Sequence, residues 1–230
     1  QASVYINGQK IKEHLGGYLP FTVSLTEAGV KPGDKCVIAV KADNSDDKSY
    51  PPGKPQYTLD FTYHGGIYRD VWMIAKSKVA ITDAVDANKV AGGGVFVHYD
   101  KISTKSADVF VNTEIKNSDS RRKSVSLITE VCDDKGKVIK TQRSSVSLNP
   151  NESRTVKHRI VISNPNLWSP KNPYLYRVNS KVVENNNIVD GGTTRVGIRK
   201  AEFKGKDGFY LNGEPYGQLI RANRHQDFAY

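Results

Sequence analysis

Apolar and polar residues alternate with a period of two along most of the chain. Side chains at every second position of a strand lie on one face of the sheet, so this alternation is typical of strands that are buried on one face. Val, Ile, Thr and Tyr, which favour strands, are frequent in these segments. The pattern predicts an all-β protein. Strands are expected at residues 21–25, 35–41, 67–72, 79–83, 107–115, 125–131, 155–162 and 174–182.

Turn signals separate these segments. Asn7-Gly8 and Asn212-Gly213 each lie between short strand-like stretches, and an Asn-Gly pair is a strong signal for a two-residue hairpin turn. Residues 43–54 are polar and interrupted by prolines, which predicts a long surface loop. The acidic side chains of this loop could hold a hard cation through their oxygens, but a solvated loop is the simpler interpretation.

The length and spacing of the segments predict two domains. A chain of 230 residues can form two separate cores, and we expect the boundary near residue 79. About seven alternating segments in the next 120 or so residues predict an immunoglobulin-like sandwich. Residues 167–176 interrupt the alternation with two prolines and several large apolar or aromatic side chains. We expect them to plug one end of that sandwich rather than to stack on a sugar.

The net charge of +10 raises the question of nucleic-acid binding. Apart from the run at residues 121–123, however, the basic residues are scattered among acidic ones and accompany no recognition helix or aromatic RNA-binding motif. A solvated basic surface is therefore expected, with no nucleic-acid partner. No stretch approaches the roughly 18 apolar residues of a membrane span, so we expect a soluble protein.

Two cysteines, Cys36 and Cys132, fall in different predicted domains and lack the spacing of a zinc site. No disulfide is expected. The sequence opens on strand-like residues without a signal core, so its start is expected to be cut and its localisation stays open.

The stretch from Asp60 to Trp72 is the first candidate for a functional site. Gly65-Gly66 permits a sharp turn, and the residues that follow it favour a strand. The structural interpretation is a glycine turn entering a strand. The functional interpretation is that Asp60, Tyr63 and His64 lie on a loop that faces a ligand.

Five short motifs occur in order and resemble those of glycoside hydrolase family 2. Four lie in the first 44 residues, and the fifth is Gly65-Gly-Ile-Tyr-Arg-Asp-Val-Trp72. Residues 167–176 are similar to a Trp-Ser-Pro and Pro-Tyr-Leu-Tyr segment of the same family. The first four motifs are residues 4–8, 16–21, 31–34 and 40–44.

The resemblance implies a fold and a division of the chain. Residues 1–78 would be a jelly-roll-like, sugar-binding β-sandwich that is incomplete at its N-terminus, and residues 79–200 an immunoglobulin-like β-sandwich. Residues 201–230 would form a hairpin and the first strand of a catalytic TIM barrel. The parent enzyme would be a retaining, exo-acting glycosidase of terminal β-linked sugars, first of all β-galactosides.

The resemblance also implies which residues contact the substrate. Asp60, His225 and Asp227 match positions that contact the sugar, whereas the two catalytic glutamates of the family match nothing in this chain. Asp70 is expected to pair with a neighbouring cation. No cofactor is required, although sodium or magnesium could serve the parent enzyme and a metal site stays undefined. The expected partner is a carbohydrate, and a homo-oligomer is possible.

Two other classes of function stay open. The chain could be a stand-alone carbohydrate-binding or adhesin module, for which two sandwiches suffice. It could also be a structural interaction domain without a role in sugar binding. Within the enzyme class, glucuronide or mannoside specificity is an alternative to galactoside specificity.

Overall fold

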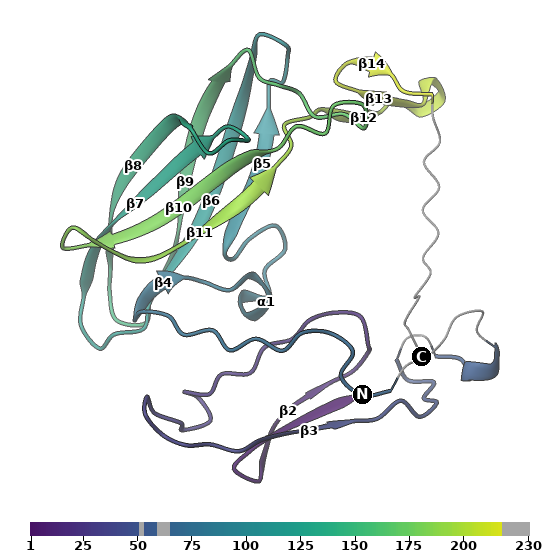
Figure 1. Cartoon of the computed structure of the whole chain (residues 1–230), viewed down its shortest axis with the longest axis vertical. Helices are drawn as coiled ribbons and strands as arrows, with labels where there is room; N and C mark the ends of the chain where they lie inside the picture. The colour runs from purple at the N-terminus through teal and green to yellow at the C-terminus, as the bar shows by residue number, and fades with distance from the viewer. Residues whose placement is uncertain (51–52, 59–64, 218–230) are drawn as a thin grey trace. The chain divides into compact units, whose positions relative to one another are not determined.

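The computed structural model describes residues 1–50, 53–58 and 65–217. The chain divides between Ile74 and Ala75 into two compact units (Figure 1), and each is described by itself. Strands are the main regular elements of both, which confirms the predicted all-β class. No helix among these described ranges is long and apolar enough to span a bilayer.

The N-terminal unit contains one antiparallel sheet, in the order β2-β1-β3, and the 3₁₀ turn Gln56–Thr58. Its strands are β1 (Ala2–Ile6), β2 (Gln9–His14) and β3 (Ile38–Ala42). Asn7 and Gly8 join the first two with φ values of 51° and 85°, which is the left-handed geometry of a type I′ hairpin turn. The predicted Asn-Gly hairpin is confirmed.

Other strand predictions in this unit are wrong. Residues 21–25 and 67–72 are not strands, and the predicted strand at 35–41 begins only at Ile38 and is exposed along its length. Trp72 is 77% exposed. A strand needs a neighbouring backbone and a covered face, and both edges of β1 are already occupied, while no second sheet covers the first in the described part of this unit.

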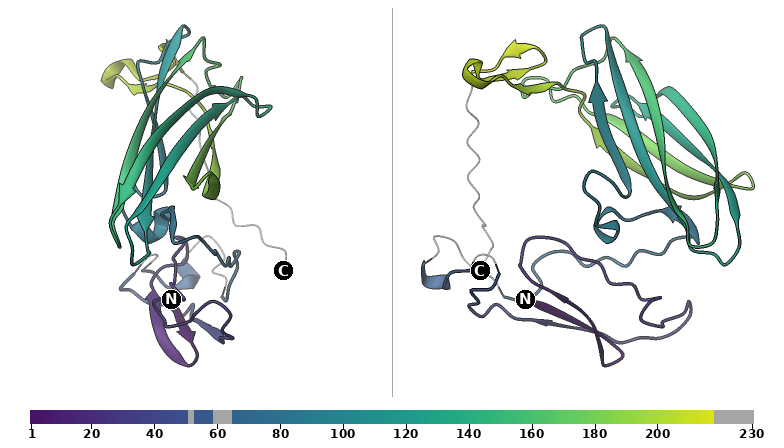
Figure 2. Two further views of the ribbon diagram at one scale, coloured as in Figure 1. Left: turned by 90° about the vertical axis from the view of Figure 1, so that its left-hand side faces the viewer. Right: turned by 180° about the vertical axis from the view of Figure 1, so that it is seen from behind.

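The second unit is a sandwich of two antiparallel sheets, seen from two further sides in Figure 2. In the first sheet, β6 pairs with β4 and β5 on one side and with β9 on the other, and the second has the order β11-β10-β7-β8. The strands are β4 (Val79–Ile81), β5 (Val95–Asp100), β6 (Ser106–Asn117), β7 (Lys123–Cys132), β8 (Val138–Leu148), β9 (Ser153–Ser163), β10 (Tyr176–Glu184) and β11 (Asn187–Val196). One helical turn, α1 (Ala84–Ala87), lies between β4 and β5.

Strands are therefore found at the predicted segments 79–83, 107–115, 125–131, 155–162 and 174–182. The structure adds β11, and it also adds β8. Its sequence, Val-Ile-Lys-Thr-Gln-Arg-Ser-Ser-Val-Ser-Leu, hides the alternation because only Val146 and Leu148 are buried apolar residues. Backbone pairing with β7 over its whole length makes this polar segment a strand.

The core of the sandwich consists of two apolar clusters separated by a polar layer. One cluster gathers around Val109, Val131 and Val178, and the other around Ile115 and Leu127. Between them lie polar residues from both sheets, which are buried except for the half-buried Ser144. We call this set the polar layer, and its members are Thr113, Thr129, Ser144, His158 and Ser180.

A small hairpin follows the sandwich. It comprises β12 (Ala201–Phe203), the 3₁₀ turn Gly205–Asp207, β13 (Phe209–Leu211) and β14 (Glu214–Pro215). Asn212 and Gly213 form its turn with φ values of 55° and 91°, which confirms the second Asn-Gly prediction.

Candidate functional site

The three residues predicted to contact substrate, Asp60, His225 and Asp227, lie outside the described residues, as do Tyr63 and His64. The structure therefore describes the segments that lead to them. Two such segments are informative: residues 65–72, which follow Asp60, and the hairpin at 201–215, which precedes His225.

The segment after Asp60 is held to the N-terminal unit by Tyr68. The Tyr68 hydroxyl donates a hydrogen bond to the carbonyl oxygen of Gly17, and the guanidinium of Arg69 lies 5.7 Å from the centre of the Tyr68 ring. A Cβ added to Gly65 would lie 3.2 Å from the side-chain nitrogen of Asn44. The glycine motif is thus a point of close packing against the loop that begins at residue 43.

Two carboxylates in the polar loop at residues 43–54 accept hydrogen bonds from serines two positions later in the chain. Asp43 accepts hydrogen bonds from the amide and the hydroxyl of Ser45. Asp47 accepts hydrogen bonds from the amide and the hydroxyl of Ser49. These bonds lower the pKa of both carboxyl groups. Among the described residues, no group of three His, Cys, Asp or Glu side chains is arranged to hold a metal ion, and no cation forms an ion pair with Asp70.

The segment before His225 is anchored to the sandwich by Asn212. Its Nδ2 donates to the carbonyl oxygen of Trp168 (3.0 Å), and its Oδ1 accepts from the amide of Lys200 (3.0 Å). The backbone amide of Trp168 in turn donates to the carbonyl of Ile198 (2.8 Å). One side chain therefore ties the hairpin turn to the loop that closes the sandwich.

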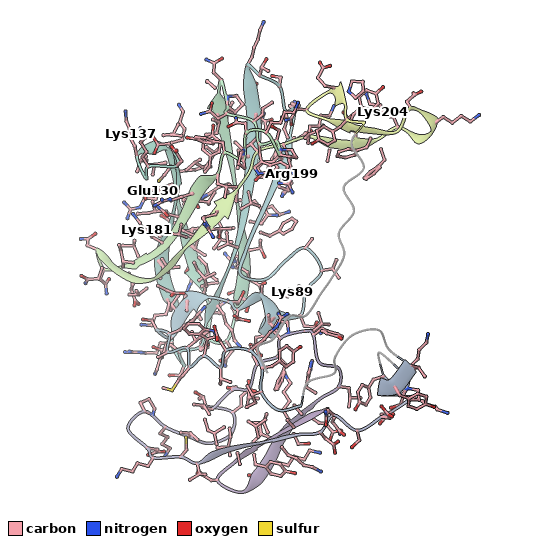
Figure 3. The ribbon with its side chains drawn as sticks, turned by 45° about the vertical axis from the view of Figure 1, so that its right-hand side comes forward. Lys89, Glu130, Lys137, Lys181, Arg199 and Lys204 are labelled. Atoms are coloured by element: carbon pink, nitrogen blue, oxygen red, sulfur yellow. The ribbon has the colours of Figure 1, made fainter. Side chains whose placement is uncertain are left out.

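Trp168 belongs to the segment 167–176, where Leu167 and Tyr174 pack against the apolar cluster around Val109. The Arg199 guanidinium lies 5.0 Å from the centre of the Trp168 ring and makes a cation–π contact with it. Arg199 is labelled in Figure 3. The predicted plug at one end of the sandwich is confirmed. Arg199 covers one face of the Trp168 ring, which favours packing over sugar stacking.

Two tyrosines near this plug keep their protons at neutral pH. Burial raises the pKa of Tyr99 to about 12, against a small opposing effect of Arg199. Tyr176 is also buried, which raises its pKa, and its hydroxyl accepts from the amide of Asn166 (2.8 Å). Both phenols therefore stay protonated and act in packing.

Sequence reasoning identified the turn at Asn212 but missed its role as an anchor. The contact joins residues 44 positions apart, and nothing in the local sequence indicates the partner. The two cysteines are free, as expected, with Cys132 buried and Cys36 half-buried.

Comparison with known proteins identifies the family. The model for glycosyl hydrolases family 2 matches residues 90–199, which cover the sandwich from the glycine-rich segment through β11 to Arg199. The chain belongs to glycoside hydrolase family 2. This assignment confirms the resemblance found in the sequence motifs.

Relatives named for two different glycosidase activities match all or nearly all of the chain. A β-galactosidase of Thermoanaerobacter pseudethanolicus is 35% identical over 100% of this chain, and a β-glucuronidase of Formosa agariphila is 33% identical over 93%. The chain spans 28% and 22% of the lengths of these two family members.

Solved family 2 structures share the fold. A β-glucuronidase from this family superposes with a TM-score of 0.82 at 33% identity, covering 93% of this chain and 22% of that one. Bacteroides uniformis β-glucuronidase 2 superposes with a TM-score of 0.84 at 28% identity, covering 98% and 26%.

Proposed function

We propose that this chain supplies two accessory β-units and part of the substrate-binding wall of a retaining, exo-acting β-glycosidase. The observation that carries the proposal is the sequence match at 35% identity over 100% of the chain to a protein named as a β-galactosidase. The match includes the N-terminal unit, which the family model does not cover.

The chemistry of such an enzyme needs two carboxyl groups on either side of the scissile bond, about 5–5.5 Å apart when configuration is retained. We propose that these are glutamates outside the present residues. The role of this chain is then to bind and orient the terminal sugar. Asp60 and Asp227 would accept hydrogen bonds from sugar hydroxyls, and His225 would contact the sugar as charge develops at the anomeric carbon.

The sugar is either a β-galactoside or a β-glucuronide. Galactoside is the first candidate from the sequence motifs, but relatives named β-glucuronidase match at 33% identity. The two sugars differ at C6, where a glucuronide carries a carboxylate in place of a hydroxymethyl group. A cation in the binding wall would favour the glucuronide.

The test is an assay of the enzyme that contains this chain with aryl β-galactoside and aryl β-glucuronide, in the wild type and in His225→Ala. We expect turnover of one substrate and a loss in kcat/KM of tenfold or more in the variant, the cost of one charge-assisted hydrogen bond. An unchanged kcat/KM in the variant would contradict the role of His225. Turnover by the 230 residues alone would contradict their accessory role.

A stand-alone carbohydrate-binding module is the alternative function. Calorimetric titration of the 230-residue chain with galactosides separates the two, because a module binds firmly without further domains, whereas a substrate-binding wall does not.

A further inference from the structure

A block of four serines lies on the outer face of the second sheet of the sandwich. Ser124 and Ser126 of β7 pair with Ser147 and Ser145 of β8, and the intervening side chains Val125 and Val146 point into the core. The four hydroxyls line a shallow hollow of about 350 Å³. Because serine side chains are short, a ligand here could lie close to the sheet.

The wall of this hollow is the turn between β10 and β11. Asn185 and Asn186 both have left-handed backbones, with φ values of 50° and 65°, so the turn is the type I′ form that suits a tight hairpin. A second hollow of about 330 Å³ adjoins the first and shares Ser124 and Asn185 with it. We call the two together the serine–arginine groove, and its charged members are Arg121, Arg122, Lys123, Arg143 and Glu184.

The serine–arginine groove carries surplus positive charge. Lys123 is neutralised because its Nζ lies 2.9 Å from a Glu184 carboxylate oxygen and 3.5 Å from one of Asp119. Among the described residues, Arg121, Arg122 and Arg143 form no ion pair. Arg122 is positioned by its Nε, which donates to the hydroxyl of Ser147 (2.9 Å).

One cation beside the groove is neutralised by a carboxylate. Lys181 of β10 lies in the same cross-strand row as Arg143, with Ile128 of β7 between them. Its Nζ lies 2.8 Å from a carboxylate oxygen of Glu130, and both side chains are labelled in Figure 3. Arg143 and Ser147 are four residues apart on β8, which corresponds to about 13–14 Å of strand. A ligand that spans from Arg143 to Arg122 is therefore longer than a single sugar ring.

The composition of the groove indicates the class of ligand. Hydroxyl and amide side chains donate to and accept from sugar hydroxyls. Guanidinium groups bind carboxylates and sulfates through paired hydrogen bonds. The lining contains no aromatic side chain on which a nucleic-acid base could stack. We propose that the serine–arginine groove binds an acidic oligosaccharide, whose carboxylate or sulfate groups pair with Arg122 and Arg143 while its hydroxyls bond to the serines.

This binding does not depend on hydrolysis, so the 230-residue chain is the test protein. Calorimetric titration at low salt would use three probes of equal length: an oligogalacturonate, a sulfated oligosaccharide and a neutral malto-oligosaccharide. We expect an acidic probe to bind and the neutral probe not to bind. Arg143→Gln should weaken binding about tenfold, the usual effect of losing one charged hydrogen-bond partner.

Two further variants separate a built site from general attraction. Lys140→Gln makes the same charge change on the same strand, but Lys140 pairs with the core residue Val131 and so lies on the opposite side of β8 from Arg143. This control should bind as the wild type does. Ser145→Val keeps every charge and should still weaken binding, because it removes a hydroxyl in the middle of the groove.

Binding of the uronate or of the sulfated probe that depends on Arg143 supports the proposal, and the probe that binds identifies the acidic group. The proposal is overturned if neither acidic probe binds, or if the neutral probe binds equally well. It is also overturned if Lys140→Gln weakens binding as much as Arg143→Gln does. A single-stranded DNA oligomer that binds more tightly, with the same dependence on Arg143, would overturn it in favour of nucleic acid.

Discussion

At the scale of single residues, close packing around Trp168 determines how the sandwich ends. Gly197 faces this side chain so closely that a Cβ built on the glycine would lie 2.8–2.9 Å from three Trp168 carbons. Real Cβ atoms do not approach carbon atoms to this distance, so either the tryptophan or the backbone that follows β11 would have to move.

Gly197→Ala is therefore expected to destabilise the second unit by about 1–3 kcal/mol, the usual cost of overpacking. Thermal unfolding followed by circular dichroism measures the effect, and the emission spectrum of Trp168 should change with it. Gly192→Ala is the matched control, because a Cβ at Gly192 meets no atom within 4 Å. Equal stability of the two variants would contradict the packing argument.

At the scale of elements, the polar layer joins the two sheets of the sandwich. His158 of β9 lies 2.9 Å from the hydroxyl of Thr129 on β7 and 2.9 Å from that of Ser144 on β8. The ring is 1% exposed. Burial lowers the pKa of His158 below its ordinary value of 6.5, so the imidazole is neutral in the folded state at pH 7.

This lowered pKa makes stability depend on pH. Between the folded and unfolded pKa values of His158 the unfolded chain binds more protons, so the free energy of unfolding falls as the pH is lowered below about 6.5. Urea unfolding of the wild type from pH 7.5 to pH 5 should show this loss. His158→Gln should be less stable at pH 7.5 but should flatten the slope below 6.5, whereas His98→Gln should keep it. A slope that persists in His158→Gln would refute the assignment.

At the scale of the whole molecule, the two units differ greatly in how much they bury. In the N-terminal unit the only buried apolar side chains among the described residues are Val4 and Ile6, whereas the second unit buries both apolar clusters. Hydrophobic burial is the main source of stability, so the two units should not unfold together.

We expect hydrogen exchange of the 230-residue chain to show faster exchange in strands β1, β2 and β3 than in strands β6, β7, β9 and β10. Protection in β1 should be lost at a lower urea concentration than protection in β6. Coincident loss of protection in the two strands would show that the units unfold as one.

The sequence predicts the second unit well because apolar and polar residues alternate in its strands, as in β6 and β9. Such strands are covered on one face, and these two pair with each other over their whole length. It fails at residues 67–72, where strand-forming side chains find no neighbouring strand in the described part of the chain. The sequence also does not predict the groove around Arg143 and its neighbouring serines. These residues come together only through the register in which β7 and β8 pair, and that register cannot be seen in the sequence. The predicted contacts Asp60, His225 and Asp227 stay predictions.

The hydrogen bonds of Asn212 can also be lost through a chemical change of its side chain. Asn-Gly is the pair most prone to deamidation, because the glycine amide can attack the asparagine side chain without hindrance, releasing ammonia and then taking up water. Water opens the cyclic imide to aspartate or to isoaspartate, in which the backbone runs through the former side-chain carbonyl. Neither product has the Nδ2 amide that donates to the Trp168 carbonyl. Stored protein would thus lose this hydrogen bond between the hairpin and the sandwich by ageing.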